Sequence, residues 1–239
     1  FVGAGLSIPA GHVDWKELLR SITKDLGLDV DRESDLVTLA QFHLNKNRDN
    51  RSELTQIVND EFNKNTDITE NHKILSRLPI ETFWTTNYDD LIERSLREAS
   101  KIPDTKFTIA HLSQSIRNRD AVVYKMHGDI THAHEVILTR DDYEAYHLNF
   151  GAYITALSGD LVAKTFLFIG FSFTDPNLEH VLSRIRTTFE TNQRKHFCIM
   201  KSVEQNVDED ESSFEYRKRR HKLVVADLIN YNIHVLEID

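Results

Sequence analysis

Hydrophobic residues follow two alternating patterns along the chain. Short runs rich in aromatic and β-branched residues are typical of strands, and they occur at 81–86, 121–126, 165–169, 196–200 and 233–238, with Phe1-Val2 resembling the end of another. Between these runs, apolar residues recur every three or four positions, which predicts helices at 14–26, 91–99, 150–163, 176–185 and 217–229, and one from Arg140. The alternation predicts an α/β fold, a Rossmann-like open and mostly parallel sheet.

One long stretch departs from this alternation. Residues 28–80 show helical periodicity only, with helices expected near 36–43, 54–62 and 70–78, the last ending at Pro79. We therefore predict a single domain over residues 1–239 with a helical insertion at about 28–80. Because the first motif lies at the very start of the sequence, most of the strand before it is expected to be missing, as in a piece of a longer protein.

Helix starts are marked by residues that can cap the first turn. Asp14, Ser52 and Thr139 each precede an amphipathic run and have the short polar side chains preferred at that position. Asp175 is followed by Pro176, which suits the first position of a helix. Capping is therefore the favoured interpretation of Asp175, although it also lies among the candidate binding residues.

Unusual polar residues gather where the predicted strands end. In parallel sheets, ligands bind outside the carboxyl ends of the strands. Four such ends have residues that could bind a ligand or take part in a reaction. They read Gly3-Ala4-Gly5-Leu6-Ser7, Asn87-Tyr88-Asp89, His127-Gly128-Asp129 and Gly170-Phe171-Ser172. Glycine-rich turns can bring backbone N–H groups close to a phosphate. Such a turn serves packing just as often, so only the set of four points to a ligand site.

Composition narrows the function classes. The chain has a formal net charge of −9, with 40% hydrophobic and 28% charged residues, which argues against general nucleic-acid binding. No run of 18 or more apolar residues predicts a membrane span. The one cysteine, Cys198, excludes an internal disulfide and a multi-cysteine zinc site, and it favours a reducing, cytoplasmic setting.

Two charged or histidine-rich stretches are interpreted as ordinary surface. The acidic residues 208–211 lead into the basic residues 217–222, which is typical of a solvated helix face rather than a binding patch. His132 and His134 beside Asp129 could suggest a metal, but two histidines in a polar loop are more often solvated. No metal is expected.

The four strand-end motifs together, in their order and spacing, resemble those of the silent-information-regulator (sirtuin) family. The resemblance rests on 3–7, on Thr85-Thr86-Asn87-Tyr88-Asp89, on Lys125-Met126-His127-Gly128 and on Gly170-Phe171-Ser172. Protein deacylases of that family carry a Pro-Asp-Phe-Arg segment and a four-cysteine zinc module, and both are lacking here. The sequence is closer to a bacterial sirtuin-like branch, with its first motif continuing into Ser7-Ile8-Pro9-Ala10-Gly11.

The resemblance implies a function and a role for each motif residue. Members of that branch are typically antiphage defence effectors that hydrolyse NAD to nicotinamide and ADP-ribose. By resemblance, Asn87 would bind the nicotinamide ribose and orient the attacking water, and His127 would be the general base. NAD would also be held by a second group of residues, namely Gly3, Ala4, Gly5, Ser7, Asp89, Gly170, Ser172 and Asp175. For Asp89, capping the next helix is an equally good interpretation.

Other functions and partners follow from the same resemblance. One alternative is an NAD-dependent protein deacylase or ADP-ribosyltransferase, and another is a non-catalytic sensor of NAD or ADP-ribose. A sensor would need neither the water-positioning Asn87 nor the base His127. The resemblance also implies a homo-oligomer and a trigger, either a phage-derived one or a partner ATPase of the translocase type, with no direct binding of nucleic acid or membrane.

Overall fold

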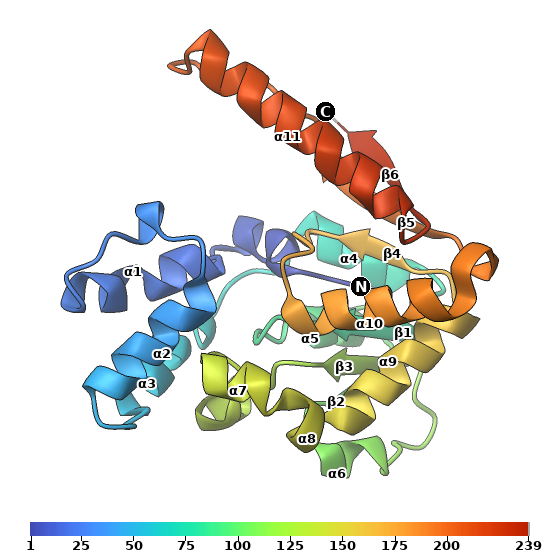
Figure 1. Ribbon diagram of the computed structural model, residues 1–239. Helices are drawn as coiled ribbons and strands as arrows, with labels where there is room; N and C mark the ends of the chain where they lie inside the picture. Colours follow the sequence, from blue (N-terminus) through green and yellow to red (C-terminus); the bar gives the residue numbers. More distant parts are fainter. Residues whose placement is uncertain (239) are drawn as a thin grey trace. The chain divides into compact units, whose positions relative to one another are not determined.

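The computed structural model describes residues 1–238, which form two compact units (Figure 1). The first unit is Val2–Tyr153. The second unit consists of Phe1 and the chain from Ile154 onward. Each unit contains its own three-stranded sheet, so each is described by itself.

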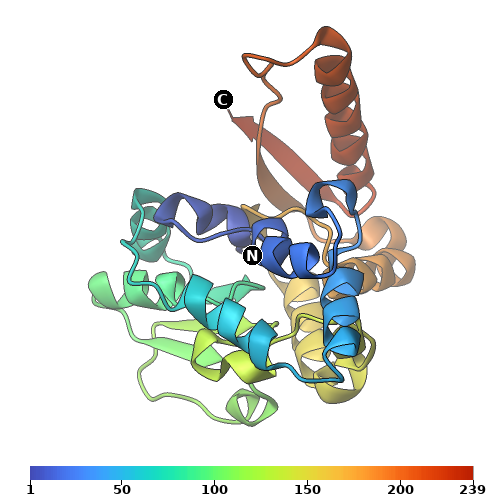
Figure 2. The same cartoon turned by 90° about the vertical axis from the view of Figure 1, so that its left-hand side faces the viewer.

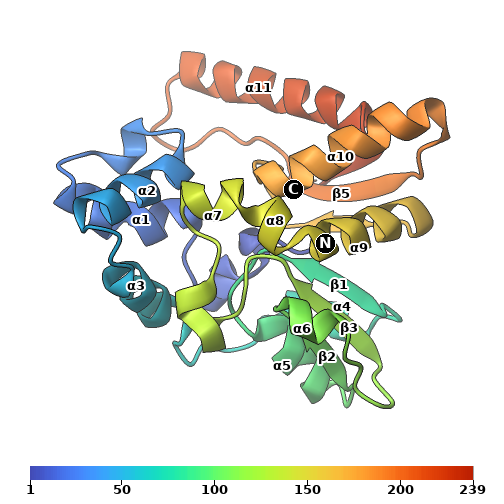
Figure 3. The same ribbon diagram turned by 60° about the horizontal axis from the view of Figure 1, so that its bottom comes forward.

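The sheet of the first unit is entirely parallel. Its strands β1 (Thr82–Thr85), β3 (Ala121–Lys125) and β2 (Pro103–Lys106) lie in the order β1-β3-β2 (Figure 3). Val2 adds a single parallel bridge to Thr85. Because all these segments point the same way, the residues that follow them emerge at one edge of the sheet. The chain after Val2, β1 and β3 carries three of the four motifs.

The sequence did not predict strand β2. Pro-Asp-Thr-Lys has neither apolar alternation nor β-branched character beyond one threonine. It lies at the edge of the sheet, where proline at the first position removes no needed hydrogen bond. Its charges are satisfied locally, because Lys106 Nζ lies 2.7 Å from an oxygen of Asp104, whose other oxygen accepts from Arg119.

Residues between the first turn and β1 are helical, as the sequence predicts. They form α1 (Trp15–Asp25), α2 (Leu36–Lys46), α3 (Ser52–Phe62) and α4 (Glu70–Arg77), joined by turns and short 3-10 segments. The apolar faces of α1, α2 and α3 share a core with residues of the strand-end loops. Its members include Leu18, Ile22, Ala40, Leu54 and Val58 together with Tyr88, Ile130 and Leu138. These helices therefore pack directly against the loops that follow β1 and β3.

Two of the predicted caps are confirmed and one is wrong. The side chains of Asp14 and Thr139 accept hydrogen bonds at the starts of α1 and of α7 (Arg140–Glu144). Ser52, in contrast, is the first residue of α3 rather than its cap. The side chain of Asn50 accepts from the Ser52 N–H at 2.9 Å instead. The capping side chain thus lies two residues earlier than expected and satisfies the first N–H of the helix.

Short helices follow β2 and β3. They are α6 (Ile109–Leu112), a 3-10 segment at Ile130–Glu135, then α7, α8 (Tyr146–Asn149) and the start of α9 (Gly151–Ala163). The helix α5 (Leu91–Glu98) leads from β1 to β2, and its buried Leu91 and Leu96 belong to the core.

The second unit is also built on parallel strands. Its order is β4-β5-β6, formed by β4 (Leu167–Ile169), β5 (His196–Lys201) and β6 (Ile233–Ile238). Its helices are α10 (Pro176–Phe189), α11 (Glu211–Ile229) and the part of α9 from Ile154 onward. Helix α11 lies beside β6 (Figure 2). The predicted α/β class with parallel strands is confirmed. No helix within residues 1–238 has both the length and the apolar character needed to cross a membrane.

Candidate active site at the strand ends of the first unit

The opening motif forms a tight 3-10 turn directly after Val2. The segment Ala4–Leu6 closes with hydrogen bonds from Leu6 N to Gly3 O (3.1 Å) and from Ser7 N to Ala4 O (2.9 Å). Gly3 is extended, with φ −116°, so the turn does not use the left-handed freedom of that glycine. The N–H groups at the start of such a turn have no partner within it, which leaves them available to an anion.

Asn87 ties this turn to the end of β1. Its Nδ2 donates to Gly3 O and to Ser7 Oγ, each at 3.1 Å, and all of these groups are buried. A primary amide has two N–H donors, so both are used within the protein. The Oδ1 oxygen is the part of Asn87 that can accept from a water or a ribose hydroxyl. The structure thus brings Gly3, Ser7 and Asn87 together, although 84 residues separate the first from the last.

Asp89 lies at the start of α5 and is 4% exposed. Its Oδ1 accepts from the Leu91 N–H at 3.1 Å, which supports the capping interpretation that the sequence left open. Its Oδ2 is buried and has no hydrogen-bond partner among the residues that the structure describes. Capping therefore accounts for one oxygen of this carboxylate and leaves the other for a further contact.

His127 follows β3 and is buried against two tyrosines. Its ring packs edge-on to Tyr143 and Tyr146, with centroids 5.4 Å and 6.4 Å apart, and its Nδ1 lies 3.5 Å from the Tyr143 hydroxyl. The His127 carbonyl accepts from the Ile137 N–H at 2.9 Å. These contacts hold the imidazole in one orientation, as a general base requires.

Gly128 is one position where a glycine is required. Its φ is +93°, and a Cβ there would lie 3.2 Å from the backbone Cα of Val136. The left-handed conformation and this close approach both exclude a side chain. They turn the chain sharply after His127, so that the following loop returns past the same residue.

A buried ion pair lies beneath this turn. Lys125 Nζ donates to the carboxylate of Asp129, and Glu93 Oε1 lies 3.6 Å from the same ammonium. Burial alone would raise the pKa of Asp129, but Lys125 and the Thr131 donors outweigh burial and lower that pKa. Burial also dominates at Glu93 and raises its pKa. For Lys125, burial is outweighed by the neighbouring carboxylates, so its pKa is raised.

The helical stretch before β1 holds α7, and thereby Tyr143, in place. Arg51 Nη1 donates to both oxygens of Asp142, at 2.7 and 2.9 Å, and Nη2 donates to Val136 O at 2.8 Å. Hydrogen bonds between a guanidinium and a carboxylate are among the stronger ones in proteins. Gln41 adds bonds to the side chain and backbone of Asp141, at 2.9 and 3.0 Å. The ring that packs on His127 therefore depends on α2 and α3.

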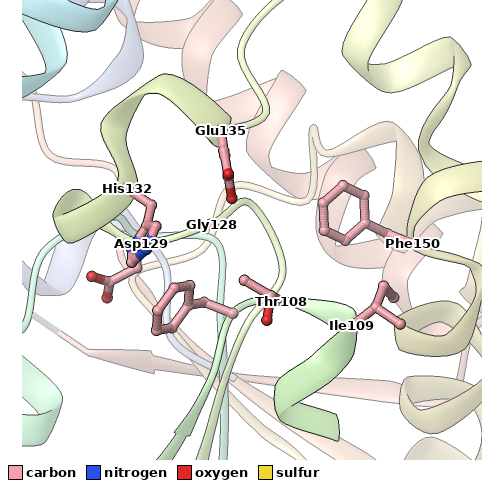
Figure 4. A pocket seen from close by; sticks show the side chains of 8 residues that line it. Thr108, Ile109, Gly128, Asp129, His132, Glu135 and Phe150 are labelled. Atoms are coloured by element: carbon pink, nitrogen blue, oxygen red, sulfur yellow. The ribbon is translucent and has the colours of Figure 1, made fainter.

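A cavity of about 110 Å³ opens beside the His127 turn (Figure 4). Phe150 and Ile109 face His132 and Asp129 across it, and the carboxylate of Glu135 points into it. Ligand pockets for drug-sized molecules are roughly 300–1,000 Å³, so this hollow alone is too small for a dinucleotide. The imidazole of His132 packs against the ring of Phe107, with the two ring centroids 5.0 Å apart. Within residues 1–238 no cluster of three or more His, Cys, Asp or Glu could hold a metal ion.

The fourth motif lies in the second unit, after β4. Gly170 has φ +63°, and Ser172 Oγ shares a hydrogen bond of 2.8 Å with Thr174. Asp175 caps α10 by accepting from the Leu178 N–H at 2.9 Å, with Pro176 at the first helical turn. The favoured capping interpretation of Asp175 is confirmed.

Sequence reasoning missed several residues that shape the site. Lys125 belongs to one of the four motifs, but its role in a buried ion pair was not predicted. A charged residue in an otherwise apolar strand is a signal of such a pair. Tyr143, Arg51 and Asp142 carried no such signal. Their contacts join segments about 90 residues apart, which no local pattern reveals.

Parallel sheets with turns of this kind at the ends of their strands define an α/β protein whose ligands bind at that edge. Residues 81–223 match the SIR2-like domain, and the chain belongs to that family. It is 54% identical over 239 residues to the NAD(+) hydrolase ThsA of Bacillus cereus (strain MSX-D12), covering all of this chain and 50% of that protein.

Two further relatives extend the comparison. The NAD(+) hydrolase ThsA of Acinetobacter baumannii (strain 532279) is 53% identical over 239 residues, covering all of this chain and 49% of that protein. Defense-associated sirtuin 2 of Bacillus subtilis is 24% identical over 243 residues, covering 97% of this chain and 23% of that protein. The chain thus spans about half the length of the NAD(+) hydrolases that it matches.

Proposed function

We propose that this chain is the catalytic part of an NAD hydrolase. The reaction breaks the bond between C1′ of the ribose and the nicotinamide nitrogen. A water oxygen bonds to C1′ and loses one proton, so that NAD and water give nicotinamide, ADP-ribose and H⁺. The observation that carries the proposal is the pairing of Asn87 with Gly3 and Ser7 in a loop adjacent to the His127 turn.

The geometry supports a division of labour among these residues. The oxocarbenium-like state of glycoside cleavage needs a positioned water and a base on the face opposite the leaving group. His127, oriented by Tyr143, would take the proton. Asn87 would act through Oδ1 alone, accepting from the water or a ribose hydroxyl, because its Nδ2 is fully used.

We assign NAD binding to the other residues of the four motifs. The turn Gly3-Ala4-Gly5 would hold the pyrophosphate through its N–H groups. The unpartnered Oδ2 of Asp89 could accept from the substrate, with the other oxygen keeping the cap. We propose phosphate or ribose contacts for Gly170 and Ser172 of the second unit as well, and a mainly capping role for Asp175.

The relatives favour hydrolysis over the alternatives. Four of them, 45–54% identical over the whole of this chain, are named NAD(+) hydrolase ThsA. Deacylation or ADP-ribosyl transfer would need an acceptor site for lysine or another nucleophile, and no contact described above points to one. A purely sensing role leaves the orientation of His127 by two tyrosines unexplained.

The biological setting is proposed from the same relatives and from the family resemblance. The name Defense-associated sirtuin 2 supports a defence role, and from the family resemblance we propose that this role consists of depleting NAD. We further propose a cytoplasmic homo-oligomer whose activity awaits a phage-derived trigger or a partner ATPase, and one NAD-binding domain that includes both units, with residues 28–80 as its helical insertion.

Chromatography of NAD incubated with the full-length protein tests the proposed activity. Nicotinamide and ADP-ribose should appear in equal amounts without any acyl-lysine acceptor. His127→Ala should lower kcat by at least 100-fold, since general base catalysis contributes roughly 10²–10⁴-fold. His134→Ala is the matched control, because that histidine is exposed and its ion-pair partner is the neighbouring Glu135. Nicotinamide release that occurs only when an acyl-lysine peptide is present, together with deacylation of that peptide, would refute the proposal.

A further inference from the structure

A fully buried ammonium links the two loops that carry the proposed catalytic residues. Lys125 is the last residue of β3, and its side chain has no solvent exposure. Its Nζ donates to Tyr88 O at 2.9 Å, to Asp89 O at 2.6 Å and to the carboxylate of Asp129. A lysine ammonium has three donors, so all of them are used.

These three bonds reach two different loops. The carbonyls of Tyr88 and Asp89 directly follow Asn87, whereas Asp129 comes two residues after His127. The Ile130 N–H adds a further bond to Tyr88 O at 3.0 Å. The ammonium therefore fixes how far the Asn87 loop stands from the His127 loop.

Packing alone does not explain a lysine at this position. Burying an ammonium and a carboxylate together costs desolvation that a hydrophobic residue of similar volume avoids. The strand around Lys125 is otherwise apolar, with Val122, Val123 and the neighbouring Met126 buried. An apolar side chain would fill the same space, but Asp89 O would lose its link to the His127 loop and Tyr88 O would keep only the bond from the Ile130 N–H.

We propose that Lys125 is a positioning residue that sets the spacing between Asn87 and His127 for cleavage of NAD. This inference rests on the proposed function. A displacement of about 1 Å at reacting groups can cost roughly 100-fold in rate. Loss of the ammonium should therefore lower kcat by roughly 100-fold and leave KM for NAD within about threefold, since the phosphate-side turn does not touch it.

The variants must separate positioning from folding. Lys125→Met alone leaves Asp129 buried without its cation, so this protein is expected to be unstable. Lys125→Met combined with Asp129→Asn removes both charges, and the oxygen of the introduced amide can still accept from the Thr131 N–H, as the carboxylate of Asp129 does at 2.9 Å. Asp129→Asn alone is the matched control, because it keeps the bonds from Lys125 to Tyr88 O and Asp89 O.

Three measurements on full-length protein decide the inference: melting temperature, kcat and KM for NAD, and hydrogen exchange of residues 87–91 and 127–131. The double variant should melt close to the Asp129→Asn control yet have roughly 100-fold lower kcat and faster exchange in both segments. If the double variant matched the Asp129→Asn control in kcat as well as in melting temperature, the role of Lys125 would be merely structural. A raised KM, or unchanged exchange, would equally overturn positioning. A wild-type protein that does not cleave NAD would defeat the proposed function, while the exchange data would still decide whether Lys125 links the loops.

Discussion

Replacing Asn87 tests whether its amide holds the opening turn in place. Asn87→Ala removes two buried hydrogen bonds, to Gly3 O and to Ser7 Oγ, both 3.1 Å long. Each such bond contributes about 1 kcal/mol. Gly3 O keeps its hydrogen bond from the Leu6 N–H, at 3.1 Å, and the Ser7 hydroxyl can rotate to another partner. The expected loss is therefore about 2 kcal/mol.

Thermal unfolding of the full-length variant gives the measurement. For a protein of this size, 1 kcal/mol corresponds to about 2–4 °C in Tm, so Asn87→Ala should melt roughly 4–8 °C lower. Ser7→Ala loses one bond only and should cost about 1 kcal/mol. In the double variant the shared bond is counted once, so the two effects should fall short of additivity by about 1 kcal/mol.

Two results would refute this reasoning. A shift below about 2 °C for Asn87→Ala would mean that the amide does not hold the turn. Full additivity of Asn87→Ala and Ser7→Ala would mean that the two side chains are not bonded to each other. The turn would then owe its position to other contacts, such as the bond from Val2 N to Trp84 O.

Two further predictions concern stability at other positions. Burial lowers the pKa of His196 to about 4, and its Nδ1 accepts from the Phe166 N–H. The unfolded state binds a proton at this histidine from about pH 6.5 downward, whereas the folded state does not. The free energy of unfolding should therefore be full above that pH and fall by about 2 kcal/mol between pH 7 and pH 5. Urea unfolding at both pH values checks this, and a His196→Gln protein that keeps the same pH dependence would contradict it. Gly128→Ala should destabilise the protein by about 2–3 kcal/mol because of the positive φ at this position and the contact with Val136. Gly159→Ala, with open space around it in α9, is the control and should be neutral or slightly stabilising. Equal melting temperatures for the two variants would argue against strain at position 128.

The sequence predicts more of the fold than of the site. Strand and helix periodicities place most elements correctly, since the apolar runs of β4 and β5 and the helical spacing of α1 are strong local signals. The strand β2 was not predicted, because its stability comes from the edge position and from the bonds of Asp104, not from an apolar pattern. Motif order indicates Asn87 and His127, but not that both Nδ2 donors of Asn87 are already used.

Contacts between distant segments account for what remained unpredicted. The bonds of Arg51 to Asp142 and of Lys125 to the Tyr88 and Asp89 carbonyls depend on how separate elements pack. Such pairings have no periodicity to read, because each residue type is ordinary in its own segment. Only Lys125, a charge in an apolar strand, gives a hint of its partners.

The bond between Gly3 and Asn87 has a consequence for how the protein folds as it is made. It closes a loop of 84 residues, and contacts that span so much sequence form late because the entropy of loop closure must be overcome first. During synthesis the helices of residues 28–80 can form before Asn87 leaves the ribosome, and the His127 turn emerges later still. A nascent chain thus completes its opening turn before it can join it to the catalytic residues, and a ribosome paused within the helical stretch carries no assembled site.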